Sequence, residues 1–403
     1  MASRGSTILP ISSVPAPGLS DAFGRVRTAG TGNRADVEFA FDLNADVCTT
    51  ITGGAGTVTY DKIGRAAVIK TNGTTTDDFA RHVLRYHAPY TPGNSQLIDI
   101  TGTLNVGNLT GTAGVFIRNN GEDTVIAQAD WHNLPDDIDW TKSQIFVMDF
   151  QSLRVGIVRF LLNRNGQSVL LHQVNNDNVR TAGYWQYPQQ PLNWGIRTTA
   201  TESVAEIGYF DAHNGIGFRF AAPKSAAAEM RAICGTVKSE GGVELNALPG
   251  VQRAQSVADA GVTVSDTLIP LISVRAKTLI NTDVVNRGLV FVRSVLAGSA
   301  ANDMVAKVYK NATLTGATFA HDPGAAAISE FDTAATAITG GELVDTFLVP
   351  GSTQSPASVA ASVRVPLSVN YAGDSSDTIT IAAIRFGAGN ATGWAGIVVS
   401  EVK

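Results

Sequence analysis

Short apolar segments alternate with turn-forming residues along most of the chain. The segments are four to eight residues long, rich in Val, Ile, Phe and Thr, and separated by Gly, Asn, Asp and Pro, which is typical of β-strands. The Asn165-Gly166 pair predicts a tight hairpin turn, because both residue types tolerate positive φ. Many short strands at this spacing predict a sandwich or jelly roll. The segments of this first series are 37–41, 56–60, 66–70, 97–100, 114–117, 143–150, 156–161 and 168–172.

A second series of strand patterns begins after residues 245–250, which contain a Pro-Gly pair and fit a linker. About seven strands in roughly 150 residues is a normal content for another sandwich. No repeat of fixed period relates the two series. The segments are 267–275, 288–293, 304–309, 343–349, 362–369, 378–385 and 395–402.

Two parts of the chain depart from this pattern. Residues 226–232 are rich in Ala and have local helix propensity, although the residues 233–237 that follow fit a strand equally well. The first thirty or so residues contain Pro10, Pro15 and Pro17 among Ser and Gly, which disfavours regular structure and predicts an extended arm. Such arms tie subunits together in assemblies.

The predicted fold class is therefore all-β, with two β-sandwich, jelly-roll-like domains preceded by an extended N-terminal arm. The predicted boundaries are 1–33 for the arm, 34–243 for the first domain and 251–403 for the second.

Charged residues make up only 16% of the chain, well below the roughly 25% of an ordinary soluble domain. A weakly charged surface suits a subunit that packs against other subunits, so we expect a homo-oligomer rather than a monomer. The net charge of −5 provides no electrostatic footprint for nucleic acid. No apolar run approaches the ~18 residues of a membrane span, and the N-terminus lacks the apolar core of a signal peptide.

The sequence predicts no cofactor, metal or catalytic residue. Glycine-rich residues 53–56 lack the Lys-Ser/Thr of a phosphate-binding loop. Cys48 and Cys234 lie far apart without a CxxC spacing, which favours burial as small apolar thiols. His82 and His87 lie five apart among arginines, an arrangement that disfavours a shared metal and favours solvated or interfacial histidines.

An acidic segment spans residues 130–139 and carries four aspartates, Asp130, Asp136, Asp137 and Asp139. Calcium is conceivable there because it prefers carboxylate ligands on loops. The spacing matches no known calcium loop, so a solvated loop is favoured. A glycosidase pair needs one acid with a raised pKa facing its partner across a cleft, which a loop sequence does not reveal.

Aromatic residues cluster at Tyr184, Trp185, Tyr187 and Trp194. An exposed aromatic platform with polar neighbours binds sugars or partner proteins, so these four form the candidate recognition surface. The alternative, which the sequence favours, is an aromatic anchor inside the sandwich or a contact between subunits.

Three stretches of the chain form a recognisable pattern: 20–27 with Phe41-Asp42, then 141–146 with 156–160, His172 and 191–197, and finally 239–242 leading to 264–275. Together they resemble a widespread group of tailed-bacteriophage virion structural proteins. The resemblance implies a particle component in the head, collar or tail, an appendage or a decoration protein. It also implies several copies, other virion proteins as partners, and a location in the virion after synthesis in the bacterial cytoplasm. No catalytic residues come with it, and residues 43–44 depart from the pattern.

Within the arm, Arg25 and Arg27 flank Val26, so both side chains would point to the same side of an extended segment. We hypothesise that Phe23, Arg25 and Arg27 dock the arm onto a neighbouring subunit. The leading functional hypothesis is a non-enzymatic structural subunit of a phage particle, with a trimer as the first expectation. The alternative is a host-surface carbohydrate-binding adhesin module of a phage tail, and a third hypothesis is a glycan-degrading enzyme.

Overall fold

The computed structural model divides the chain into two compact units, residues 1–245 and 246–403. Phe23, Arg25, Arg27 and Trp185 are outside the part of the chain that it describes. The described residues are 32–90, 94–106, 112–133, 138–151, 155–176, 183–184, 187–224, 228–239, 251–256, 261–280, 284–319, 327–351, 357–361 and 365–402.

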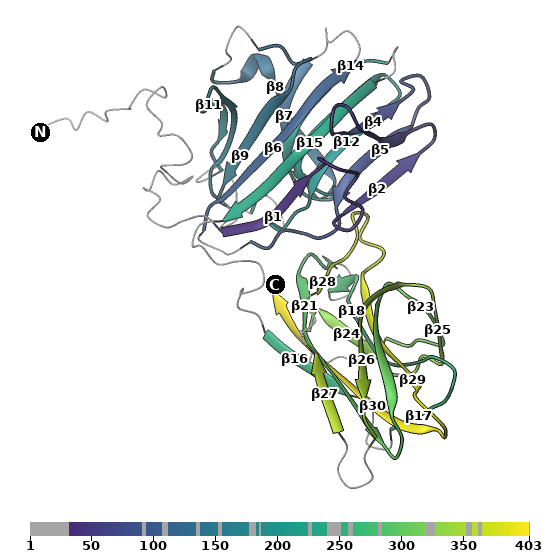
Figure 1. Ribbon diagram of the computed structural model, residues 1–403. Coiled ribbons are helices and arrows are strands. Elements are labelled where there is room, and N and C mark those ends of the chain that lie inside the picture. Colours follow the sequence, from purple (N-terminus) through teal and green to yellow (C-terminus); the bar gives the residue numbers. More distant parts are fainter. Residues whose placement is uncertain are drawn as a thin grey trace, which may run out of the picture. The chain divides into compact units, whose positions relative to one another are not determined.

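The first unit contains an eight-stranded antiparallel sheet. Its strands follow the order β11-β10-β9-β6-β15-β4-β3, and β1 also pairs with β15. Figure 1 shows β6 and β15 side by side near the middle of this sheet. The bounds are β1 (Gly32–Glu38), β3 (Thr57–Asp61), β4 (Ala66–Thr71), β6 (Gln96–Val106), β9 (Gln144–Phe150), β10 (Val158–Arg164), β11 (Gln167–Val174) and β15 (Ala228–Ser239).

A seven-stranded antiparallel sheet packs against it, in the order β2-β5-β12-β13-β14-β7-β8. One hydrophobic core contains residues of both sheets, which makes the unit a sandwich. A short 3₁₀ turn, η2 (Gln128–Asp130), follows the last strand of the order. The bounds are β2 (Cys48–Gly53), β5 (Phe79–Leu84), β7 (Thr112–Asn119), β8 (Glu122–Ala127), β12 (Leu192–Thr198), β13 (Glu202–Phe210) and β14 (Gly215–Pro223).

Aromatic side chains from the two sheets meet in this core. The ring of Trp194 on β12 packs edge-on against Phe39, with centroids 5.4 Å apart. Phe146 on β9 packs against Phe218 on β14 at 4.8 Å. All four side chains are fully buried. Burial of large rings from opposite sheets fixes how the layers stack.

The backbone conformation tests two local predictions, the hairpin turn at Asn165-Gly166 and the helix over residues 226–232. Asn165 and Gly166 both adopt positive φ, +52° and +75°, between β10 and β11, so the predicted hairpin turn is confirmed. The helix expected over 226–232 is wrong, because residues from Ala228 onward form β15. Its side chains alternate between buried and half-buried, and its backbone bonds to β4 on one side and β6 on the other. Sheet pairing here outweighs a weak intrinsic helix propensity.

The second unit is also a sandwich of antiparallel sheets. One sheet has the order β16-β30-β21-β27, with β17 on β30 and β28 on β21, and the other has the order β24-β18-β29-β22-β26. Its core is almost entirely aliphatic. Two small two-stranded sheets, β19-β20 and β23-β25, complete the unit. The bounds are β16 (Val251–Ser256), β17 (Val262–Val264), β18 (Ile269–Ala276), β19 (Leu279–Ile280), β20 (Val284–Val285), β21 (Leu289–Ala300), β22 (Met304–Lys310), β23 (Thr313–Thr315), β24 (Ser329–Asp332), β25 (Ala337–Thr339), β26 (Glu342–Val349), β27 (Ala357–Ala361), β28 (Val365–Leu367), β29 (Thr378–Arg385) and β30 (Ala391–Val402).

The all-β, two-sandwich fold class predicted from the strand pattern is confirmed. Among the described residues no α-helix occurs, and none of their helical segments has the length and hydropathy to cross a membrane.

Truncation of Trp194 tests the packing of the first core. We expect Trp194→Ala to lower the free energy of unfolding of the first unit by about 3–5 kcal/mol, because a large cavity opens between the sheets. Urea denaturation followed by far-ultraviolet circular dichroism measures this change. Ile63→Ala is the control, since this side chain is 97% exposed and its loss should change stability by less than about 0.5 kcal/mol. Equal effects of the two substitutions would contradict the placement of Trp194.

Candidate functional site on the seven-stranded sheet

The outward face of the seven-stranded sheet carries an unusual set of charged side chains. On β13 the alternate residues Ile207 and Tyr209 belong to the core, so Glu206 points away from the eight-stranded sheet. Strand register places Arg81, Gly195, Glu206 and Arg219 side by side in one row across four strands. A carboxylate thus lies in the middle of this face with guanidinium groups on both sides.

Glu206 is fully buried and is bonded by three arginines from three other strands. Arg81 Nη2 donates to Oε2 at 3.0 Å, and Arg118 Nη2 donates to Oε1 at 3.1 Å. Arg197 Nη2 approaches the same Oε1 at 3.4 Å. Arg118 also holds Asp123 through two bonds, of 2.7 Å from Nε and 2.9 Å from Nη2. The result is a charge cluster of three guanidinium groups and two carboxylates.

These arginines determine the protonation state of Glu206. Burial by itself would raise the pKa of the carboxyl group, but Arg81, Arg118 and Arg197 outweigh burial and lower the pKa from 4.5 to about 2. The carboxylate is therefore ionised throughout the physiological range.

The charge cluster also shows that this face is concave. Arg197 on β12 lies 3.8 Å from Asp123 on β8, although β13, β14 and β7 separate the two strands in the sheet. Four strand spacings would place them roughly 19 Å apart on a flat sheet, beyond the combined reach of the two side chains. The sheet must curl toward this side for the contact to form.

Two glycines allow large side chains to lie flat on the concave face. A Cβ at Gly195 would lie 2.8 Å from Arg81 Nη1, and a Cβ at Gly217 would lie 2.8 Å from the ring of Phe116. Neither position can accept a larger residue without moving these groups. Glycine in the middle of a strand is costly in itself, so it marks a place where close approach is needed.

One half of the concave face is filled by aromatic rings and guanidinium groups. Phe116 and Phe210 pack edge to face at 5.1 Å, and the guanidinium of Arg118 lies 5.2 Å and 5.0 Å from their ring centres. Arg118 Nη1 also donates to the backbone oxygen of Asp211 at 2.9 Å. Cation–π contacts and the several hydrogen bonds of Arg118 make this half a structural layer.

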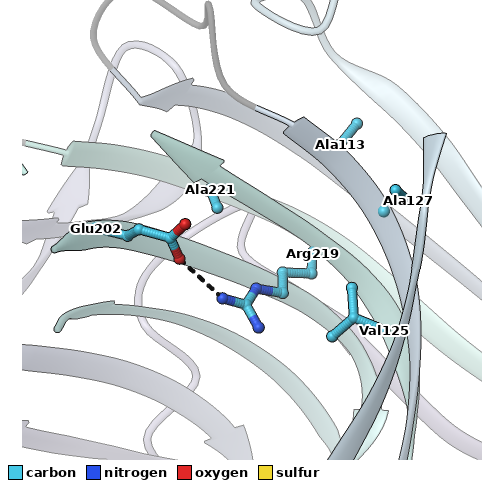
Figure 2. Close-up of a pocket in the computed structure, with 7 residues that line it drawn as sticks. Ala113, Val125, Ala127, Glu202, Arg219 and Ala221 are labelled. Atoms are coloured by element: carbon cyan, nitrogen blue, oxygen red, sulfur yellow. Dashed lines mark hydrogen bonds and ion pairs between the residues drawn. The ribbon is translucent and has the colours of Figure 1, made fainter. Parts of the chain in front are cut away.

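The other half contains an open pocket of about 210 Å³. Glu202 and Arg219 lie on one side of it, joined by a 3.1 Å bond from Nη2 to Oε2, while Val125 and Ala127 lie on the other (Figure 2). The Glu202 side chain is 42% exposed and the Arg219 side chain 19%. The remaining lining residues are small: Ala113, Gly114 and Ala221.

The carboxylates of the charge cluster are close together, and Glu206 does not have the raised pKa of a glycosidase acid. Glu206 and Asp123 bond the same Arg118 nitrogen at 3.1 and 2.9 Å, which is close enough for a pair of the kind used in glycoside hydrolysis, at roughly 5–9.5 Å. The guanidinium occupies the space between them. The pKa of Glu206 is lowered, whereas a general acid needs a raised pKa.

The aromatic residues proposed from the sequence as a recognition surface do not lie together on the surface. Trp194 and Tyr184 are fully buried, and burial raises the pKa of the Tyr184 hydroxyl. Tyr187 is half-buried. Tyr184 and Trp194 occupy core positions, which agrees with the alternative of an aromatic anchor inside the sandwich. Trp194 is buried because β12 lies inside the sheet, where alternate side chains face the core.

The expectation of solvated or interfacial histidines is wrong for His82 and His87, which are buried within the first unit. Nε2 of His82 donates to the backbone oxygen of Leu43 at 2.8 Å, so Nδ1 accepts from the hydroxyl of Thr50 at 3.1 Å. Burial lowers the pKa of His82 to about 4, so the ring is neutral. Nε2 of His87 lies 3.5 Å from an Asp211 oxygen.

Asp139, from the acidic segment, stabilises a turn. Its Oδ1 accepts from the backbone nitrogen and the hydroxyl of Thr141, at 2.9 and 2.6 Å. These bonds lower the pKa of the Asp139 carboxyl group. Asp136 and Asp137 lie outside the described residues. In the described part of the chain, no three His, Cys, Asp or Glu side chains gather as a metal site.

Both cysteines are free thiols. Cys48 is buried, and burial raises the pKa of its thiol to about 12. Cys234 is half-buried on β15. The buried position of Cys48 agrees with a small apolar side chain in the core.

Sequence reasoning missed the charge cluster because its members are far apart along the chain. One local indication was available: Glu206 interrupts the apolar run from Val204 to Phe210. A charged residue in such a run is seldom buried without partners. Nothing local identifies the partners, because they are placed by strand order.

No protein-family model and no curated protein matches the chain. Among solved structures, lectin UEA-II complexed with galactose is similar at 8% identity and a TM-score of 0.22, over 52% of this chain and 100% of the lectin. A carbohydrate esterase from the Shiga toxin-encoding bacteriophage phi24B is similar at 8% identity and a TM-score of 0.21, over 53% of this chain and 100% of the esterase. A legume lectin-like domain from Entamoeba histolytica is similar at 9% identity and a TM-score of 0.20, over 52% of this chain and 98% of that domain. Scores this low establish neither a shared family nor a shared function.

The lowered pKa of Glu206 predicts acid sensitivity of the first unit. Because the folded pKa is about 2 and the ordinary value is 4.5, the stabilisation from Glu206 is fully present above pH 4.5 and is lost as the pH falls toward 2. The loss should amount to roughly 3 kcal/mol. Urea unfolding at a series of pH values between 5 and 2.5 measures it.

The variant Glu206→Gln tests the same point independently. It should lower stability at neutral pH by about 3–5 kcal/mol, because it removes the charge that balances buried arginines. Its stability should also depend less on pH below 4.5. A wild-type pH dependence that survives unchanged in this variant would show that Glu206 is not the titrating group.

Proposed function

We propose that the protein is a non-enzymatic structural subunit of a bacteriophage particle, in the head, collar or tail, where it acts as an appendage or decoration protein. It is anchored through its N-terminal arm, assembles as a homo-oligomer, with a trimer as the first expectation, and is located in the virion. The particle assignment is supported by the resemblance to tailed-phage virion proteins over residues 20–27, 141–146, 156–160, 191–197, 239–242 and 264–275.

The observation that supports assembly most directly is the outer strand of one sheet in the second unit. β26 is the last strand in its order and, within the described residues, pairs with β22 alone. It exposes Leu343 by 52%, Leu348 by 51% and Val344 by 36%. Proteins protect long edge strands with charged residues, Pro or bulges, and β26 has Glu342, Asp345 and a bulge at Val344 but no Lys or Pro. The exposed apolar side chains of this outer strand are suited to packing against another subunit.

The charge cluster supports a non-enzymatic role for the concave face. Each carboxylate of the cluster is bonded to at least one arginine, and Glu206 has a lowered pKa. General acid–base catalysis instead needs groups with pKa values near the working pH. The cluster has the properties of a structural ion network.

Removal of the arm tests the anchoring proposal. Deletion of residues 1–28 should abolish incorporation into particles, and Phe23→Ala, Arg25→Ala and Arg27→Ala together should do the same. Quantitative mass spectrometry of purified particles measures the copy number. Arg4→Ala is the matched control, because it removes an arginine of the same arm outside the 20–27 stretch. Full incorporation of the protein that lacks residues 1–28 would contradict the anchoring proposal.

Charge on the edge strand tests the assembly proposal. The double variant Leu343→Lys and Leu348→Lys should convert the oligomer into smaller species, because lysines on an edge oppose strand pairing. Sedimentation velocity of the full chain measures the mass. Leu279→Lys is the control, since Leu279 is 42% exposed but lies on β19. A monomeric wild type, or an oligomer that both sets of variants leave intact, would count against β26 as the contact.

A second candidate function is recognition of a carbohydrate on the host surface. The pocket beside Glu202 and Arg219 favours it, because a small open site with convergent polar groups is the usual form of a ligand site. The aromatic residues Tyr184 and Trp194, being buried, give this function no support.

A further inference from the structure

We propose that the open pocket on the concave face of the first unit binds one neutral, hydroxylated sugar residue of a glycan, held between the Glu202–Arg219 pair and the Val125–Ala127 side. This inference rests on the second candidate function, the recognition of a carbohydrate. It assigns that role to residues outside the aromatic cluster.

The size of the pocket suits a single sugar residue. Its volume is about 210 Å³, smaller than the roughly 300 Å³ at which sites for drug-sized molecules begin. The floor is kept open by Gly114 and Ala221. A Cβ at Gly114 would lie 3.0 Å from the backbone oxygen of Ile126, so a larger residue would press against β8 and close the space.

The polar pair matches the hydrogen-bonding needs of adjacent hydroxyl groups. A hydroxyl group donates one hydrogen bond and accepts others, a carboxylate accepts, and a guanidinium donates. Arg219 Nη2 donates to Glu202 Oε2 at 3.1 Å, which leaves the second Glu202 oxygen and other Arg219 nitrogens for a ligand. Two neighbouring hydroxyl groups can therefore bond one partner each without breaking the ion pair.

The exposure of this pair distinguishes it from the charge cluster. The Glu202 side chain is 42% exposed, whereas the Glu206 side chain is 1% exposed and bonded by three arginines. An exposed ion pair is weak, so a ligand can adjust it at little cost. A deeply buried network resists such change, which makes Glu202 the available carboxylate on this face.

The opposite side of the pocket offers an apolar surface. Val125 is 43% exposed on β8, and Ala127 follows two residues later on the same face of that strand (Figure 2). Sugar rings have C–H faces that pack on apolar side chains while their hydroxyl groups bond polar ones. A ring placed between the two sides would satisfy both.

The charge of the pocket favours a neutral ligand. The positive charge of Arg219 is balanced by Glu202 at 3.1 Å, so an anionic sugar would have to compete with this carboxylate and would be repelled by it. A neutral polyol meets no such penalty.

Binding to the full-length protein tests the proposal. An array of immobilised neutral and acidic mono- and oligosaccharides identifies bound glycans, and titration calorimetry with the strongest neutral one gives the affinity. Ala221→Leu should abolish binding, because it fills the floor of the pocket. Glu202→Gln and Arg219→Lys should each weaken it at least tenfold, because one side of the polar pair is altered.

Matched controls come from an ion pair on the other sheet. Arg231 is 40% exposed and bonds Glu229 at 3.1 Å and Asp61 at 2.6 Å, away from the pocket, so Arg231→Lys and Glu229→Gln should leave binding unchanged. Circular dichroism and thermal unfolding confirm that each variant is folded, and if Ala221→Leu does not fold, the two polar variants decide the question.

Three outcomes would overturn the proposal: no glycan bound by the wild type, binding of acidic sugars alone, or binding that survives the pocket variants. Failure here is distinguishable from failure of the particle assignment. The pocket variants should enter particles at the wild-type copy number, whereas the arm variants should retain glycan binding.

Discussion

The buried carboxylate of Glu206 is the constraint on which the architecture of the first unit depends. Its three arginines come from β5, β7 and β12, so one charged group joins four strands of the seven-stranded sheet. Burying such a group is costly unless it is fully paired. The sheet must therefore bring all these strands to one register and one curvature. A shift of β13 by one residue would place the carboxylate in the aromatic core and Ile207 among the arginines.

The curvature that the charge cluster requires also creates the open pocket. Where the face is crowded by Phe116, Phe210 and Arg118, no space remains, and the groups there stabilise the fold. Where the lining residues are Gly114 and Ala221, the same curl leaves a small hollow. The curvature of one sheet thus gives the concave face one half that stabilises the fold and one half that is open to a ligand.

The second unit follows a different physical plan. Its core is aliphatic, and its most distinctive described feature is the apolar edge of β26. Unpaired backbone groups next to exposed leucines promote aggregation of a monomer, whereas in an assembling subunit they can pair with a neighbouring subunit. The two units are therefore proposed to have different roles. The first is stabilised by its charge cluster and offers a pocket, and the second has an aliphatic core and offers an outer strand for contact with another subunit.

The sequence by itself determined the kind of structure. Alternation of apolar and polar residues is a local property, so it identified most strands and favoured a fold made of sheets. The Asn165-Gly166 turn was likewise predicted locally, from two residue types that tolerate positive φ. It failed over residues 228–232, where an Ala-rich segment has no strong preference and the neighbouring strands β4 and β6 decide. The tertiary structure alone decided the site. Arg81, Arg118 and Glu206 are up to 125 residues apart, and only strand order and curvature bring them together. The burial of Trp194, likewise, follows from which face of β12 meets the opposite sheet, and no single segment carries that information.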